Sequence, residues 1–224
     1  MESIPDTSAP CAAEIVVASA SVLAACAEGW MLVGWPPVVI VGGSGAIGLL
    51  LWLRTYRHGP VSPAVILPPF LLTVAMLEVH MAEEYLAGFA PAMSRLFDIG
   101  WTERGFLLVF AFAGPAIYAL TALGLFRGVR LAGFVAAFIF VGPGAAEFTH
   151  FLFPLLTPAI DPDLSATITR QVADGTLVAD MGNHWIGVTG RYYFPGLYTA
   201  VMPMVPGIWG VVSTLRAKRR ASSG

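Results

Sequence analysis

The chain has 224 residues, of which 57% are hydrophobic and only 12% are charged. A soluble domain carries about 25% charged residues, so most of this chain is expected to be surrounded by lipid. The formal net charge of -2 leaves no basic surface for phosphate groups and argues against nucleic acid as a partner. The predicted fold is one all-α integral membrane domain over residues 1–224, because no polar stretch is long enough to form a second core.

Six stretches are apolar enough, or nearly so, to form membrane helices, which need roughly 20 residues each. In chain order they are residues 12–32, 36–53, 64–88, 105–126, 129–153 and 193–215. Glu14 and Glu28 interrupt the first stretch, and its link to the second is short. A re-entrant hairpin is therefore the alternative at this end, and five to six membrane-spanning helices are expected.

Residues 157–190 form the longest stretch that is not hydrophobic. This segment mixes Pro, Asp and Thr with a weakly amphipathic run from Leu164 to Val178. Such a run is typical of a short helix lying on the membrane surface. We expect residues 157–190 to form an outer-side loop or a surface helix.

The distribution of basic residues predicts the orientation, because cytoplasmic loops carry an excess of Lys and Arg. With the C-terminus inside, eight basic residues fall on the cytoplasmic side and four on the outer side. The eight are Arg54, Arg57, Arg127, Arg130, Arg216, Lys218, Arg219 and Arg220. The chain is therefore expected to be a multi-pass protein of the cell membrane with both termini in the cytoplasm.

Histidines and carboxylates gather in two of the predicted helices. His80 precedes Glu83 and Glu84 by three and four residues, so these side chains can share one helix face. Glu147 and His150, three residues apart, can share a face of the fifth helix. Under the predicted topology, both groups lie near the outer ends of their helices, and we interpret them as one working site.

Two further features bear on this site. His184 and Tyr193 lie on the same outer side. Pro143 and Gly144 come just before Glu147, and a proline bend there would aim Glu147 toward the third helix, although an ordinary membrane-helix kink is the alternative.

The cost of burying these groups favours a functional role. An ionised residue at the centre of a membrane helix costs about 2.5–3.5 kcal/mol on insertion scales. The alternative is a His–Glu network that only holds two helices together, but polar contacts between membrane helices contribute only ~0.6 kcal/mol each.

One hypothesis is a membrane enzyme that performs acid–base chemistry of the isomerase or cyclase type on a lipid or isoprenoid-like substrate. A carboxyl group in apolar surroundings can hold a proton at neutral pH and deliver it to an alkene or epoxide. In this hypothesis Glu84 and Glu147 transfer protons, and His80 and His150 tune their pKa values. Glu83 and Tyr193 are further catalytic candidates.

A second hypothesis is a metal site. Mixed nitrogen and oxygen ligands suit zinc or non-haem iron. The candidate ligands are His80, Glu84, Glu147, His150 and His184, a set that fits one metal ion better than two. A proton-coupled transporter or ligand-binding membrane module is a third alternative, although no internal repeat of the transporter kind is visible.

The string His80-Met81-Ala82-Glu83-Glu84 resembles the signature of the HXXEE-domain family of bacterial integral membrane proteins. Two later strings are similar to motifs of the same family, Glu147-Phe148-Thr149-His150 and the run from Tyr193 to Ala200. The resemblance covers about residues 64–215. It implies a helical membrane protein and no particular reaction.

A looser likeness is to the sterol-isomerase (emopamil-binding) superfamily. Those proteins carry a His and a Glu one turn apart on an early membrane helix, as at His80 and Glu84, and another Glu on a later helix, where Glu147 stands. By analogy, this likeness implies proton transfer on a lipid substrate.

Overall fold

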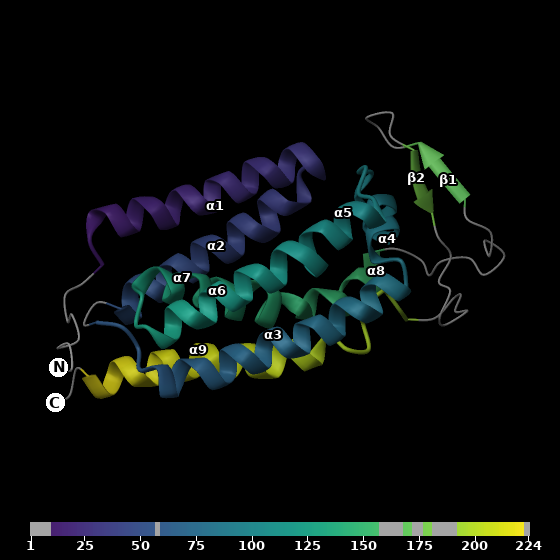
Figure 1. Ribbon diagram of the computed structural model, residues 1–224. Coiled ribbons are helices and arrows are strands. Elements are labelled where there is room, and N and C mark those ends of the chain that lie inside the picture. Colours follow the sequence, from purple (N-terminus) through teal and green to yellow (C-terminus); the bar gives the residue numbers. More distant parts are fainter. Residues whose placement is uncertain (1–9, 57–58, 157–167, 172–176, 181–191, 222–224) are drawn as a thin grey trace.

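The computed structural model describes residues 10–56, 59–156, 168–171, 177–180 and 192–221 (Figure 1). Within these residues, five long helices are apolar enough to cross a membrane. Their bounds are Ala12–Leu32 (α1), Pro36–Thr55 (α2), Pro63–Leu86 (α3), Glu103–Phe126 and Arg130–Phe151. A sixth long helix, α9 (Val201–Ala221), runs beside α3. The predicted helical bundle is confirmed for these elements.

The fourth and fifth long helices are not regular throughout. The fourth consists of α5 (Glu103–Leu107), a π-helical segment (Leu108–Ala113) and α6 (Gly114–Phe126). The fifth consists of α7 (Arg130–Ile139), a π-helical segment η3 (Phe140–Gly144) and a 3-10 segment η4 (Ala145–Phe151). The winding changes around Pro143, where proline cannot donate the backbone hydrogen bond of a regular helix.

One predicted helix is wrong in part. The last helix was expected to begin at residue 193, but it begins at Val201, and residues 195–200 before it form turns. Gly196 in this loop has a φ of 91°, which a right-handed helix excludes.

Residues 157–190 were expected to form an outer-side loop or a surface helix, and the described residues of that stretch form no helix. These residues form two antiparallel strands, β1 (Ile168–Gln171) and β2 (Leu177–Asp180), paired from Ile168↔Asp180 to Gln171↔Leu177. The β-branched residues of this segment favour strand over helix.

Two short helices cover one end of the bundle. They are α4 (Phe89–Phe97), which follows α3, and α8 (Phe153–Leu156), which follows η4. Figure 1 shows that this end lies opposite the end where α1 begins and α9 finishes. The site residues of α3 lie near its C-terminal end and therefore close to these short helices.

Small residues allow the helices that carry the site to approach closely. A Cβ atom added to Gly207 of α9 would lie 2.8 Å from the Cα atom of Gly144, and one added to Gly144 would lie 3.0 Å from the Cα atom of Gly207. Gly210, one turn further along α9, packs against the ring of Phe140. Such backbone contacts are typical of helix packing in membranes.

This packing predicts that Gly207→Ala destabilises the protein. The added methyl group meets backbone atoms that cannot move aside, and overpacking of this kind costs roughly 1–3 kcal/mol. Thermal unfolding in detergent should show a lower midpoint. Gly43→Ala is the matched control, because a Cβ atom at Gly43 has no neighbour within 4 Å and Ala favours a helix over Gly. An equal loss in both variants would contradict the packing argument.

Candidate functional site

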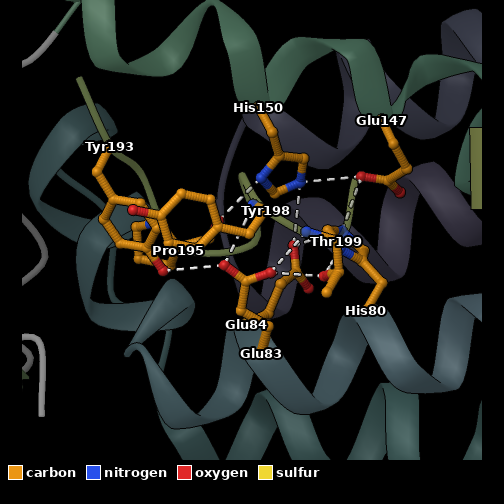
Figure 2. Close-up of polar contacts among 9 residues, drawn as sticks. All are labelled: His80, Glu83, Glu84, Glu147, His150, Tyr193, Pro195, Tyr198 and Thr199. Atoms are coloured by element: carbon orange, nitrogen blue, oxygen red, sulfur yellow. Dashed lines mark hydrogen bonds and ion pairs between the residues drawn. The ribbon is translucent and has the colours of Figure 1, made fainter. Parts of the chain in front are cut away.

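Two helical segments supply the four side chains of the site. The C-terminal part of α3 carries His80 and Glu84 one turn apart, and η4 carries Glu147 and His150 three residues apart. Figure 2 shows the side chains of the two segments pointing toward one another. One ligand atom from each residue lies within 4.8 Å of the other three. The predicted meeting of these four residues is therefore present.

Nitrogen and oxygen atoms alternate around the cluster. The Nε2 atom of His80 lies 3.5 Å from Glu84 Oε1 and 3.2 Å from Glu147 Oε2. The Nε2 atom of His150 lies 3.1 Å from Glu84 Oε1 and 2.9 Å from Glu147 Oε2. Each imidazole thus faces both carboxylates, and each carboxylate faces both imidazoles.

The cluster is shielded from its surroundings. The side chains of His80, Glu84 and His150 are exposed by 2% or less, and that of Glu147 by 14%. The Oε2 atom of Glu84 is buried and has no hydrogen-bond partner. A buried carboxylate oxygen without a partner is costly and calls for an explanation.

Aromatic rings pack around His150. The ring centroids of Phe89, Phe153 and Phe194 lie 5.4, 5.7 and 6.4 Å from the centroid of the His150 ring. The rings of His80 and His150 meet edge to face at 4.8 Å. The imidazoles therefore sit in apolar surroundings, in which electrostatic interactions among the four groups are strong.

The Nδ1 atoms of both imidazoles contact the loop that precedes α9. His150 Nδ1 lies 2.9 Å from the carbonyl oxygen of Pro195, and His80 Nδ1 lies 2.9 Å from the hydroxyl of Thr199. Because a carbonyl oxygen can only accept, the Nδ1 atom of His150 carries a proton. In a neutral imidazole, the lone pair of Nε2 then points into the cluster.

Glu83 is buried but belongs to a second layer behind the cluster. Its carboxylate accepts hydrogen bonds from the Tyr193 hydroxyl at 3.1 Å, the Tyr198 amide at 3.3 Å, and the amide and hydroxyl of Thr199 at 2.8 and 2.6 Å. Burial raises the pKa of the Tyr193 phenol, and the Glu83 carboxylate raises it further. Tyr193 therefore stays protonated and donates to Glu83.

The remaining predicted residues lie apart from the four-residue cluster. Glu83 and Tyr193, expected as catalytic groups, contact each other. His184, expected as a metal ligand, lies outside the described residues. Sequence reasoning assigned no role to Pro195 and Thr199, although both lie in the run from Tyr193 to Ala200 that was singled out for its resemblance.

Comparison with known proteins finds no match among family models, curated proteins or solved structures.

Gly196 is the point where the loop touches both histidines. A Cβ atom on Gly196 would lie 2.7 Å from His150 Cε1 and 2.8 Å from His80 Cε1, and the φ of 91° is one that other residues rarely adopt.

We expect Gly196→Ala to destabilise the protein more than Gly128→Ala. Gly128 also has a positive φ, of 72°, but a Cβ atom there has no neighbour within 4 Å. The Gly128 variant therefore measures backbone strain alone, about 1–2 kcal/mol, whereas the Gly196 variant also displaces the two imidazoles. Chemical unfolding in detergent measures both losses. Equal losses would mean that the loop does not press on the histidines.

Proposed function

We propose that this chain is an integral membrane protein that binds one divalent metal ion through His80, Glu84, Glu147 and His150. The observation that carries the proposal is the convergence of two imidazole nitrogens and two carboxylate oxygens within 4.8 Å inside the bundle. Mixed nitrogen and oxygen ligation suits zinc or non-haem iron.

The size of the cluster supports a single ion. With metal–ligand bonds of about 2.0–2.2 Å, tetrahedral ligand atoms lie about 3.3–3.6 Å apart. The four N···O distances of the cluster are 2.9, 3.1, 3.2 and 3.5 Å. The remaining separations reach 4.8 Å, so the widest pair of ligand atoms would have to close by about 1 Å to reach tetrahedral spacing around one ion.

Charge also supports the proposal. Two ionised carboxylates in an apolar bundle are costly, and a divalent cation cancels their formal charge. A network of ion pairs between protonated histidines and the carboxylates is the competing interpretation. That network leaves the buried Oε2 atom of Glu84 without a partner. A metal ion bound to Glu84 could be coordinated by this second carboxylate oxygen as well.

We further propose that the metal ion serves chemistry on a hydrophobic molecule, such as a lipid or an isoprenoid-like compound. A bound metal ion polarises an oxygen of the substrate or activates a water molecule. The aromatic rings beside His150 and the low exposure of the cluster favour an apolar substrate over a water-soluble one. The resemblance to the HXXEE-domain family agrees with a membrane protein but supplies no reaction.

Acid–base catalysis without metal is the second candidate. The same short contacts between imidazoles and carboxylates support it. A proton shared between His150 Nε2 and Glu147 Oε2, 2.9 Å apart, is the kind that a general acid could deliver. Metal analysis separates the two candidates.

The metal proposal predicts that protein purified in detergent contains about one zinc or iron ion per chain. The Glu84→Gln and His150→Ala variants should lose this ion, because each removes a side chain of the kind that binds metal in structural and catalytic sites. Elemental analysis measures the metal content. Glu78→Gln is the matched control, because Glu78 lies on the same helix but outside the four-residue cluster. A His184→Ala variant tests the remaining predicted ligand.

Two outcomes would reject metal binding. One is wild-type protein that contains no metal and takes none up from added Zn²⁺ or Fe²⁺. The other is equal metal content in the wild-type, Glu84→Gln and His150→Ala proteins. In either case, an activity abolished by Glu84→Gln would favour acid–base catalysis instead.

The proposal of a membrane protein rests on the five apolar helices. The start of α1 and the end of α9 lie at the same end of the bundle. Figure 1 shows the link between α6 and α7 at that end and α4 at the end near the site. Arg127 lies in that link and Asp98 directly follows α4, and both side chains are exposed. We propose that the Arg127 end faces the cytoplasm, since basic residues favour that side.

This orientation is tested with single cysteines in a Cys11→Ala, Cys26→Ala background. In intact cells, Asp98→Cys should react with a membrane-impermeant thiol reagent, whereas Arg127→Cys should react only after lysis. The reverse pattern would invert the orientation, and labelling of both sites in intact cells would reject a membrane-spanning arrangement.

A further inference from the structure

We infer that Glu83 and Thr199 are positioning residues that determine which nitrogen of His80 binds the metal ion. The inference rests on the proposed metal site and deepens it. Neither residue belongs to the group of four ligand atoms, but Thr199 joins the Glu83 carboxylate to the His80 ring.

The carboxylate of Glu83 accepts four hydrogen bonds from the loop. The amides of Tyr198 and Thr199 can only donate, and the Tyr193 hydroxyl is a third donor. With the Thr199 hydroxyl, four donors meet a carboxylate that offers about four lone-pair sites. Glu83 therefore has no free lone pair with which to bind the metal ion itself, and its charge is held by the loop.

The direction in which Thr199 donates its single hydroxyl proton then determines which nitrogen of His80 is protonated. Thr199 Oγ1 lies 2.6 Å from Glu83 Oε2, a distance typical of a hydroxyl that donates to a carboxylate. The same oxygen must therefore accept from His80 Nδ1, 2.9 Å away. With its proton on Nδ1, the neutral His80 ring turns the lone pair of Nε2 toward Glu84 and Glu147.

Both histidines are thus oriented by one segment of the chain, but by different acceptors. His150 donates to the neutral carbonyl of Pro195, whereas His80 donates to a hydroxyl that is hydrogen-bonded to a carboxylate. An acceptor linked to a negative charge makes the imidazole a more basic ligand. Loss of this link should weaken metal binding without removing any ligand atom.

The test compares Zn²⁺ affinities in detergent, measured by competition with a chromophoric chelator. Thr199→Val removes the hydroxyl at nearly constant volume, and we expect binding to weaken by about 10–100-fold, as for other partners of metal-bound histidines. Thr199→Ser keeps the hydroxyl and should restore the affinity to within a few-fold of wild type. Thr214→Val is the matched control, because the Thr214 hydroxyl is buried and donates to the Gly210 carbonyl of its own helix, α9.

A second measurement reads the histidine directly and needs no variant. In protein labelled with ¹⁵N-histidine and loaded with Zn²⁺, we expect His80 to carry its proton on Nδ1 and to bind the ion through Nε2. Long-range proton–nitrogen correlation spectra distinguish this state from binding through Nδ1, and a purely structural role for Thr199 would not determine it.

The outcomes separate the two proposals. Wild-type protein that binds Zn²⁺ through Nδ1 of His80, or a Thr199→Val variant that binds as tightly as wild type, overturns this inference and leaves the metal site standing. Wild-type protein that binds no Zn²⁺ overturns both. Weak binding in Thr199→Val together with near-normal binding in Thr199→Ser and Thr214→Val supports the positioning role.

Discussion

The contact on which the site depends is the attachment of the loop before α9 to the carboxylate of Glu83. Four donors from three residues of this loop bind that one carboxylate. Hydrogen bonds to a charged group contribute about 1.5–3 kcal/mol each, so this attachment is strong for a segment without regular secondary structure. It holds the Pro195 carbonyl and the Thr199 hydroxyl within hydrogen-bonding distance of His150 and His80. Without it, the histidines would lose their orientation while keeping their places on the helices.

Neighbouring carboxylates on α3 thereby acquire different roles. Adjacent residues on a helix are rotated by about 100°. Glu84 shares the face of His80 and meets His150, whereas Glu83 turns toward the loop. Both are 2% exposed, so burial alone does not distinguish them. Only the partners do, because one carboxylate is satisfied by donors and the other keeps an oxygen that has none.

The fifth long helix positions its two site residues through a departure from regular α-helical geometry. Its π-helical segment and the 3-10 segment that follows bring Glu147 and His150 to the side that faces α3. At Gly144, the backbone of this region lies against Gly207 of α9. Winding changes of this kind often occur at functional sites in helices. The small residues let α9 approach closely, so the loop at its start can reach the histidines.

Much of this protein was determined by the sequence alone. Hydropathy predicted the long helices, and the spacings of His80 to Glu84 and of Glu147 to His150 predicted two shared faces, because both are local properties of the chain. The first residue of the last helix, the hairpin strands and the separate role of Glu83 were not predictable in this way. His80 and Thr199 are 119 residues apart, and His150 and Pro195 are 45 apart. The packing of α3, η4 and α9 determines which of these distant residues come into contact. The spacing of residues within one helix contains no information about the loop that packs against that helix.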